Sequence, residues 1–204
     1  MPNLKFRRTQ ERYYSPHHQL FHIAKIALKE ANESNVGRDL NILKAITFSA
    51  LGAEAFLNAL GYRTKSDWKI FERVAPGEKL KSLCDHFNFP FEKTSEPWQA
   101  LNCLFQLRND IVHGKPEHLR TESVLPEVGL EKTRFDHPKS SLEKQLTVRN
   151  ADRYCEATKN MLETFRKFVP QDIGFEIFQD GWSGSVSLAW TLLYLIFSLR
   201  LNQS

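Results

Sequence analysis

Apolar residues recur at helical spacing over two long segments near the start of the chain. Residues 16–34 carry the first apolar stripe. The second segment, residues 39–60, precedes Gly61, a residue type that commonly ends helices. Within it, residues 45–60 are apolar nearly all round. A helix of that kind is buried on every side, so the pattern predicts the central helix of the fold.

Two more helices are predicted further along the chain. Residues 96–113 follow Ser95, a suitable N-cap residue, and Gly114 marks their end. Residues 150–169 again carry apolar side chains on one side, and shorter helical pieces are expected at 67–73 and 77–86. The expected fold class is therefore all-α, a bundle of four main helices supported by short helices.

The predicted bundle spans residues 15–169, and polar segments lie before it and within it. Residues 1–14 form a basic leader, which we expect to be solvated. Residues 115–148 form a long polar connection before the last core helix, and their stretch 122–130 is a candidate for strand pairing. A connection of that length is either functional or mobile.

Residues 170–204 form a tail that differs in composition from the rest of the chain. Its stretch 181–199 contains no charged residue, and residues 188–199 are strongly apolar. That apolar part is short for a membrane span. We therefore expect an apolar C-terminal helix packed on the bundle or on a second subunit, with a membrane anchor as the alternative.

The overall composition is that of an ordinary soluble protein with room for one domain. The chain has 204 residues, a net charge of +4 and a sequence pI of 8.9, which permits nucleic acid as a partner without requiring it. Its three cysteines form no CxxC pattern, and its first residues lack an apolar signal region. These features favour a cytoplasmic protein.

Candidate chemistry gathers at the end of the helix predicted over residues 96–113. Arg108 lies on its apolar side, and His113 is its last residue. Asn109 and His113 are one turn apart and share a face. An imidazole can move a proton, and a guanidinium can hold a phosphate and the charge that develops on it. The combination is suited to cleavage of a phosphodiester bond.

Glu54 is the single ionisable residue of the central apolar segment. A carboxylate in such a setting is costly unless it is paired. Antiparallel packing of the two helices would bring it to Arg108, so we predict a Glu54–Arg108 ion pair that fixes the guanidinium. A structural role for Glu54 is as well supported as a catalytic one, and a structural hydrogen bond is favoured for Asn58.

The motif Arg108-Asn109-x-x-x-His113 at a helix end resembles the R-x4-6-H motif of the HEPN superfamily. The segment FSALGAEAFLNAL, with Glu54 and Asn58, is similar to an earlier HEPN helix, and VRNADRYCEATKNMLETF is similar to the closing one. The resemblance covers residues 15–169. It implies a metal-independent endoribonuclease that needs no cofactor and works as a homodimer, with two motifs facing one cleft.

The resemblance also implies roles for the individual residues. His113 would be the general base or acid for attack of a ribose 2′-hydroxyl, and Arg108 would stabilise the transition state. Asn109 would orient the phosphate or the imidazole. RNA is then the substrate, and an antitoxin or regulatory protein is a further partner, because family members often serve in toxin–antitoxin, antiviral defence or RNA-processing systems.

Other family members keep the bundle as an interaction or regulatory module without cleavage, and this is the second hypothesis. A third is a membrane-tethered form that uses residues 188–199. His18 and His22 lie one turn apart, a spacing that two metal ligands can share, and Cys84 and His86 could supply others. No supporting pattern accompanies them, so no metal site is expected.

Overall fold

The computed structural model describes residues 6–122, 137–179 and 182–188, which belong to two compact units. The larger unit, Ser15–Phe178, contains the helices. The smaller unit is built from the described residues of the two chain ends. The larger unit therefore extends past residue 169, where the sequence pattern ends the bundle.

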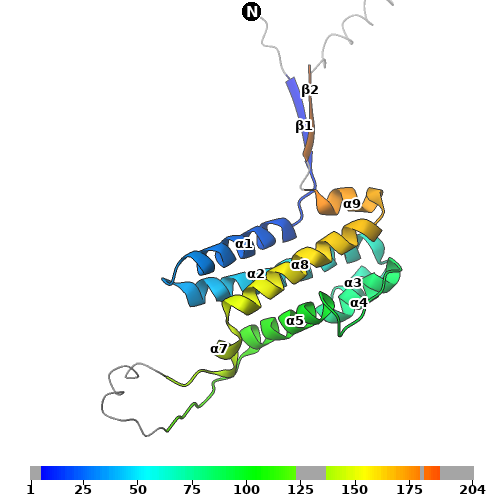
Figure 1. The fold of residues 1–204 in the computed structure, drawn as a ribbon. Coiled ribbons are helices and arrows are strands. Elements are labelled where there is room, and N and C mark those ends of the chain that lie inside the picture. Colours follow the sequence, from blue (N-terminus) through cyan, green and yellow to red (C-terminus); the bar gives the residue numbers. More distant parts are fainter. Residues whose placement is uncertain (1–5, 123–136, 180–181, 189–204) are drawn as a thin grey trace, which may run out of the picture. The chain divides into compact units, whose positions relative to one another are not determined.

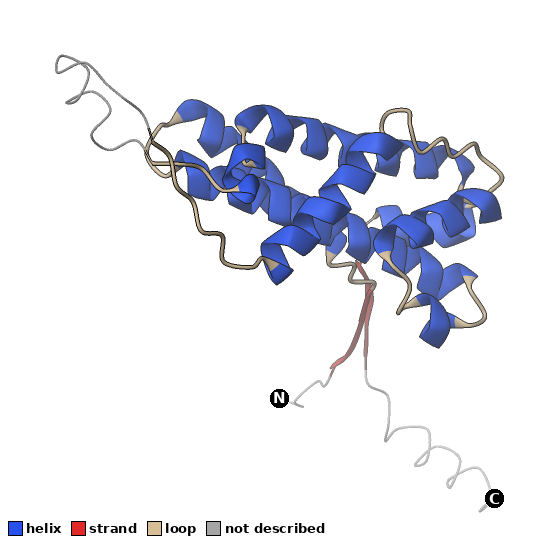
Figure 2. Ribbon diagram, turned by 90° about the horizontal axis from the view of Figure 1, so that it is seen from below, coloured by secondary structure: helices blue, strands red, loops and turns tan. Residues whose placement is uncertain are grey.

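Four long helices form the larger unit, and the predicted all-α bundle is confirmed (Figure 1). They are α1 (His17–Glu33), α2 (Arg38–Thr64), α5 (Trp98–His113) and α8 (Val148–Phe168). Helix α2 packs against each of the other three, and α5 runs in the opposite direction to it. Viewed from below, these helices lie side by side as one layered bundle (Figure 2).

Helix α2 is the core helix, as its apolar sequence predicts. Phe56, Leu57 and Leu60 are fully buried in it. By length and composition α2 is also the one helix among the described residues that could cross a membrane, but half of its most apolar window is buried inside the bundle. Its hydropathy therefore fits a core helix of the bundle.

The predicted end of α2 at Gly61 is wrong, because the helix continues to Thr64. Gly61 is fully helical and buried, and a Cβ there would lie 2.1 Å from a ring carbon of Phe71. The missing side chain lets α3 (Trp68–Phe71) pack directly on the α2 backbone. This glycine is explained by close packing rather than by helix termination.

The short helices before α5 lie close to their predicted positions. Helix α4 (Pro76–His86) follows α3 and packs on both α2 and α5. The N-cap prediction for Ser95 is wrong: Pro97 holds that position, and the Ser95 hydroxyl donates to the Glu92 carbonyl at 3.0 Å. The helix start is shifted by two residues as a result.

The polar connection contains a helical turn that its sequence pattern did not reveal, α7 (Ser141–Gln145). A capping box between Ser140 and Glu143 begins it. Glu117 accepts a hydrogen bond from the Ser141 backbone at 3.1 Å, which ties the start of the connection to its end. Apart from Glu122, which lies in a loop, the predicted strand stretch 122–130 is outside the described residues.

Helix α9 (Gln171–Phe178) closes the larger unit and was not predicted. The imidazole Nε2 of His18 lies 3.0 Å from the Ile177 carbonyl oxygen, and the Phe178 ring lies 5.7 Å from the Phe56 ring. His18 therefore has a structural contact that joins α9 to the start of α1.

The smaller unit is a two-stranded antiparallel ribbon of β1 (Phe6–Arg12) and β2 (Trp182–Leu188). Its register pairs Phe6 with Leu188 and Arg12 with Trp182. Two expectations are corrected here: the basic leader contains a strand, and the first part of the uncharged tail is a strand rather than a helix. Residues 189–199, which hold the rest of the predicted apolar helix and the possible anchor, lie outside the described residues.

Candidate active site

The predicted ion pair between Glu54 and Arg108 is confirmed. Nη2 of Arg108 donates to Oε2 of Glu54 at 2.9 Å. The Arg108 side chain is 25% exposed and that of Glu54 is 22% exposed. The pair is thus partly shielded from water, where a charge-assisted hydrogen bond is stronger than at an open surface.

Asn109 holds the same guanidinium from a second direction. Its Oδ1 accepts a hydrogen bond from Nη1 of Arg108 at 3.0 Å. Arg108 is therefore anchored at both terminal nitrogens, once by the neighbouring helix and once by its own. Among the described residues, no hydrogen bond uses the second hydrogen of either terminal nitrogen, so the outer edge of the guanidinium keeps donors for a ligand.

The inner nitrogen of this guanidinium is in a different position. Nε of Arg108 is buried and has no hydrogen-bond partner among the described residues. An unsatisfied buried donor costs free energy, so the fold keeps Arg108 at this place at some expense. A guanidinium that served stability alone would gain from a partner at Nε.

His113 is the last residue of α5, as predicted, and its side chain is exposed. Gly114 ends the helix as predicted, since a Cβ there would lie 2.7 Å from the Asp110 carbonyl oxygen. In the described part of the chain no hydrogen bond or ion pair involves the His113 imidazole. The imidazole lies one turn beyond Asn109 and is open to solvent.

Lys79 is a site residue that the sequence analysis missed. It projects from α4, is 2% exposed, and its Nζ donates to Oδ1 of Asn58 at 2.8 Å. Burial lowers the pKa of Lys79, the carboxylates of Glu54 and Glu72 act against that shift, and Arg108 adds to it. Lys79 is therefore close enough to Glu54 and Arg108 to belong to one electrostatic cluster.

The contact of Lys79 also explains Asn58, for which a structural role was expected. Asn58 lies one turn after Glu54 on α2, so both side chains lie on one face of that helix. The two hydrogen bonds link α2 to α4 and to α5 in the same region of the bundle. In the sequence Lys79 looks like one of several lysines of an amphipathic helix, and only its spacing from Leu83 indicates a buried face.

The charges of this cluster do not cancel. Lys79 and Arg108 are cations, and Glu54 is the carboxylate bonded to one of them. The excess positive charge lies behind the exposed edge of the Arg108 guanidinium. Such an arrangement suits an anionic ligand, and a phosphate in particular, because the guanidinium fork matches its oxygens.

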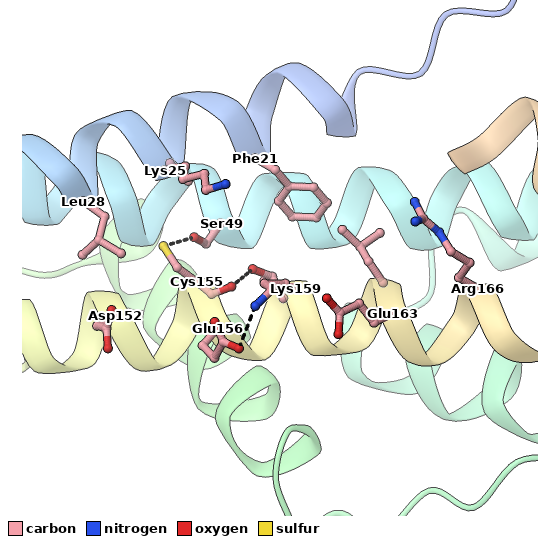
Figure 3. Close-up of a pocket in the computed structure, with 13 residues that line it drawn as sticks. Phe21, Lys25, Leu28, Ser49, Asp152, Cys155, Glu156, Lys159, Glu163 and Arg166 are labelled. Carbon is pink, nitrogen blue, oxygen red and sulfur yellow. Dashed lines mark hydrogen bonds and ion pairs between the residues drawn. The ribbon is translucent and has the colours of Figure 1, made fainter. Parts of the chain in front are cut away.

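A separate pocket lies between α1, α2 and α8 (Figure 3). It has a volume of about 370 Å³, and the apolar side chains of Phe21 and Leu28 line it beside charged residues of α8. Ser49 and Cys155 form a hydrogen bond of 3.2 Å in it, and burial raises the pKa of the Cys155 thiol. None of the four predicted site residues lines this pocket.

Metal ligands do not gather in the described residues: no group of three or more His, Cys, Asp and Glu side chains could hold an ion there. Comparisons with models of protein families, with curated proteins and with solved structures each find no match for this chain. The function of the chain must therefore be inferred from the geometry of the four site residues and their neighbours.

Proposed function

We propose that this protein is a metal-independent endoribonuclease of the HEPN type. The observation that supports this most is the anchored guanidinium of Arg108, bonded to Glu54 at 2.9 Å and to Asn109 at 3.0 Å on the helix that ends in an exposed His113. A fixed cation and a free imidazole on one helix end are the two groups that phosphodiester transesterification requires.

In the proposed reaction, the His113 imidazole accepts the proton of a ribose 2′-hydroxyl as that oxygen attacks the adjacent phosphorus. Arg108 donates hydrogen bonds to the non-bridging oxygens, where negative charge increases in the transition state. The bond from phosphorus to the 5′-oxygen breaks, and this oxygen takes a proton. The products are a 2′,3′-cyclic phosphate and a 5′-hydroxyl.

Glu54 and Asn109 contribute by holding Arg108 rather than by reacting. A guanidinium restrained at both terminal nitrogens loses little freedom when the phosphate binds, so more of the binding energy is available to the transition state. The carboxylate also balances part of the charge brought by Arg108 and Lys79. In this proposal Glu54 is a positioning residue.

The leaving oxygen needs a proton donor while His113 acts as the base. A second copy of the chain would supply one through its own His113, so the proposed active form is a homodimer with two motifs in one cleft. RNA is the substrate, and the site needs no cofactor. An antitoxin or regulatory protein would then act by covering this cleft, and a cytoplasmic location is part of the same proposal.

The decisive experiment incubates the purified full chain with mixed RNA in the presence of EDTA. Wild-type protein is expected to cleave, and the products are expected to carry cyclic-phosphate and 5′-hydroxyl ends. His113→Ala is expected to be inactive, while His22→Ala, which removes another exposed histidine, keeps the wild-type rate. Cleavage that requires a divalent ion, or that survives in His113→Ala, would refute the proposal.

An interaction module without catalysis is the second candidate. Ile23 and Ile26 of α1 are one turn apart and are 39% and 45% exposed, so α1 offers apolar surface for a partner. In that case the Arg108–Glu54 pair serves the fold alone. Wild-type protein that leaves RNA intact under all conditions, and an Ile23→Asp variant that loses a co-purifying protein, would favour it.

A further inference from the structure

Strand β1 presents two different faces, although all seven of its residues are exposed. Alternate residues of a strand point to opposite sides. Phe6, Arg8, Gln10 and Arg12 therefore share one face, and Arg7, Thr9 and Glu11 share the other. We name the first the Arg8 face and the second the Arg7 face.

The charge of the two faces is different. The Arg8 face carries two arginines and no carboxylate, whereas the Arg7 face carries Arg7 and Glu11, whose charges cancel. In the described part of the chain no carboxylate forms an ion pair with Arg7 or Arg8. The net positive charge of β1 is thus concentrated on one side of the strand.

Aromatic rings accompany this charge. Phe6 belongs to the Arg8 face and is 60% exposed. The exposed Tyr13 and Tyr14 follow the strand, and the Arg12 guanidinium lies 5.3 Å from the centre of the Tyr14 ring. Exposed rings between cations are typical of surfaces that bind single-stranded nucleic acid, where bases stack on rings and cations follow the backbone.

We propose that the Arg8 face of β1 binds single-stranded RNA. Arg8 and Arg12 would contact phosphates, and Phe6 would stack on a base. The two arginines are four positions apart, about 13 Å along an extended strand. The choice of RNA over DNA rests on the proposed ribonuclease function, and the inference adds to it that the substrate is single-stranded and is held with little sequence preference.

Two other occupants fit this face less well. A second copy of β1 would bring its own arginines against Arg8 and Arg12, and like charges oppose such pairing at a strand edge. A membrane surface would gain little apolar area, because Phe6 is the one large apolar side chain that β1 itself offers. The charge and the single ring are better matched to a phosphate backbone with stacked bases.

The test uses the full chain with His113→Ala, so that binding is measured without cleavage. The probe is a fluorescent oligouridylate of about 12 nucleotides, long enough for one binding surface. Arg8→Glu is compared with Arg7→Glu, because the two residues are adjacent, exposed and chemically identical but lie on opposite faces. Both substitutions change the net charge by the same amount.

Arg8→Glu is expected to weaken RNA binding about tenfold and to lower the salt dependence by about one phosphate contact, whereas Arg7→Glu changes the affinity less than about twofold. Phe6→Ala is expected to lose at least about fivefold, the effect of one stacked base. Arg8→Lys retains the charge and is expected to keep most of the affinity, which separates loss of the contact from loss of the strand.

Equal losses in Arg8→Glu and Arg7→Glu would overturn the inference, since they would show a general charge effect. So would an Arg8→Glu variant that binds RNA normally but loses binding to phosphatidylserine vesicles. Failure of the proposed function is distinguishable: if His113→Ala still cleaves RNA while Arg8→Glu alone lowers affinity, the catalytic assignment fails and the binding face stands.

Discussion

The candidate site has a held half and a free half, and they differ in how the fold constrains them. Glu54, Arg108, Lys79 and Asn58 are joined across three helices by hydrogen bonds of 2.8–2.9 Å, and none of these side chains is fully exposed. His113 is exposed at a helix end, with no hydrogen bond among the described residues. The difference indicates that the first group carries stability and position, and that the imidazole is left free for chemistry.

If this division is right, substitutions in the held half change stability and activity together, and those in the free half change activity alone. Glu54→Ala is expected to have the largest effect. It leaves Arg108 partly buried without its carboxylate, which should cost about 2 kcal/mol of unfolding free energy, less than the about 3–5 kcal/mol of a fully buried pair. Urea denaturation measures this, and RNA cleavage should be lost as well.

Glu30→Ala is the matched control for that variant, because Glu30 is an exposed glutamate in the helix α1. It is expected to change the unfolding free energy by less than about 0.5 kcal/mol. If Glu54→Ala were as stable as Glu30→Ala, the ion pair would contribute nothing and the held half would have lost its centre.

Lys79→Met sharpens the comparison through pH. Burial lowers the pKa of Lys79 in the folded state below the 10.5 of the free side chain. Between the lowered value and 10.5, the unfolded chain binds more protons than the folded chain, so wild-type stability gains from this lysine as the pH rises through that window. Lys79→Met lacks the gain.

The measurement for Lys79 is urea denaturation of both proteins at neutral pH and near pH 10. Wild type is expected to gain stability relative to Lys79→Met toward the alkaline end. A difference that is the same at both pH values would mean that Lys79 is not desolvated in the cluster. Lys81→Met, at an exposed position of the same helix, controls for the general effect of alkali.

Asn109→Ala tests the border between the two halves. Asn109 is exposed but bonds to Arg108, so its loss should change stability by less than about 0.5 kcal/mol and slow cleavage about tenfold, the effect of one hydrogen bond to a charged group. Cleavage kinetics on the variant and on Gln106→Ala, an exposed residue of the same helix, check this. Equal rates in both would place Asn109 outside the site.

The held half was predictable only where the sequence conflicts with its surroundings. Glu54 interrupts a long apolar segment, and that conflict indicated a partner, which is Arg108. Lys79 creates no such conflict, because α4 is short and carries lysines on more than one face. A buried lysine in an amphipathic helix cannot be told from an exposed one by periodicity alone.

The strands were missed for a different reason. Every residue of β1 is exposed, so its sequence lacks the alternation of apolar and polar residues by which a half-buried strand is found. Its partner β2 lies at the opposite end of the chain, and no local pattern encodes that pairing. Gly61 shows the related limit for helices: whether a glycine ends a helix or lets an aromatic ring approach depends on tertiary packing.

The most direct test of the account measures stability and cleavage on the same preparation of His113→Ala. Because the imidazole is exposed, the unfolding free energy is expected to stay within about 1 kcal/mol of wild type, while cleavage of RNA in EDTA is abolished. A variant that unfolds like wild type and still cleaves at the wild-type rate would contradict the central claim that His113 is the free catalytic group of this site.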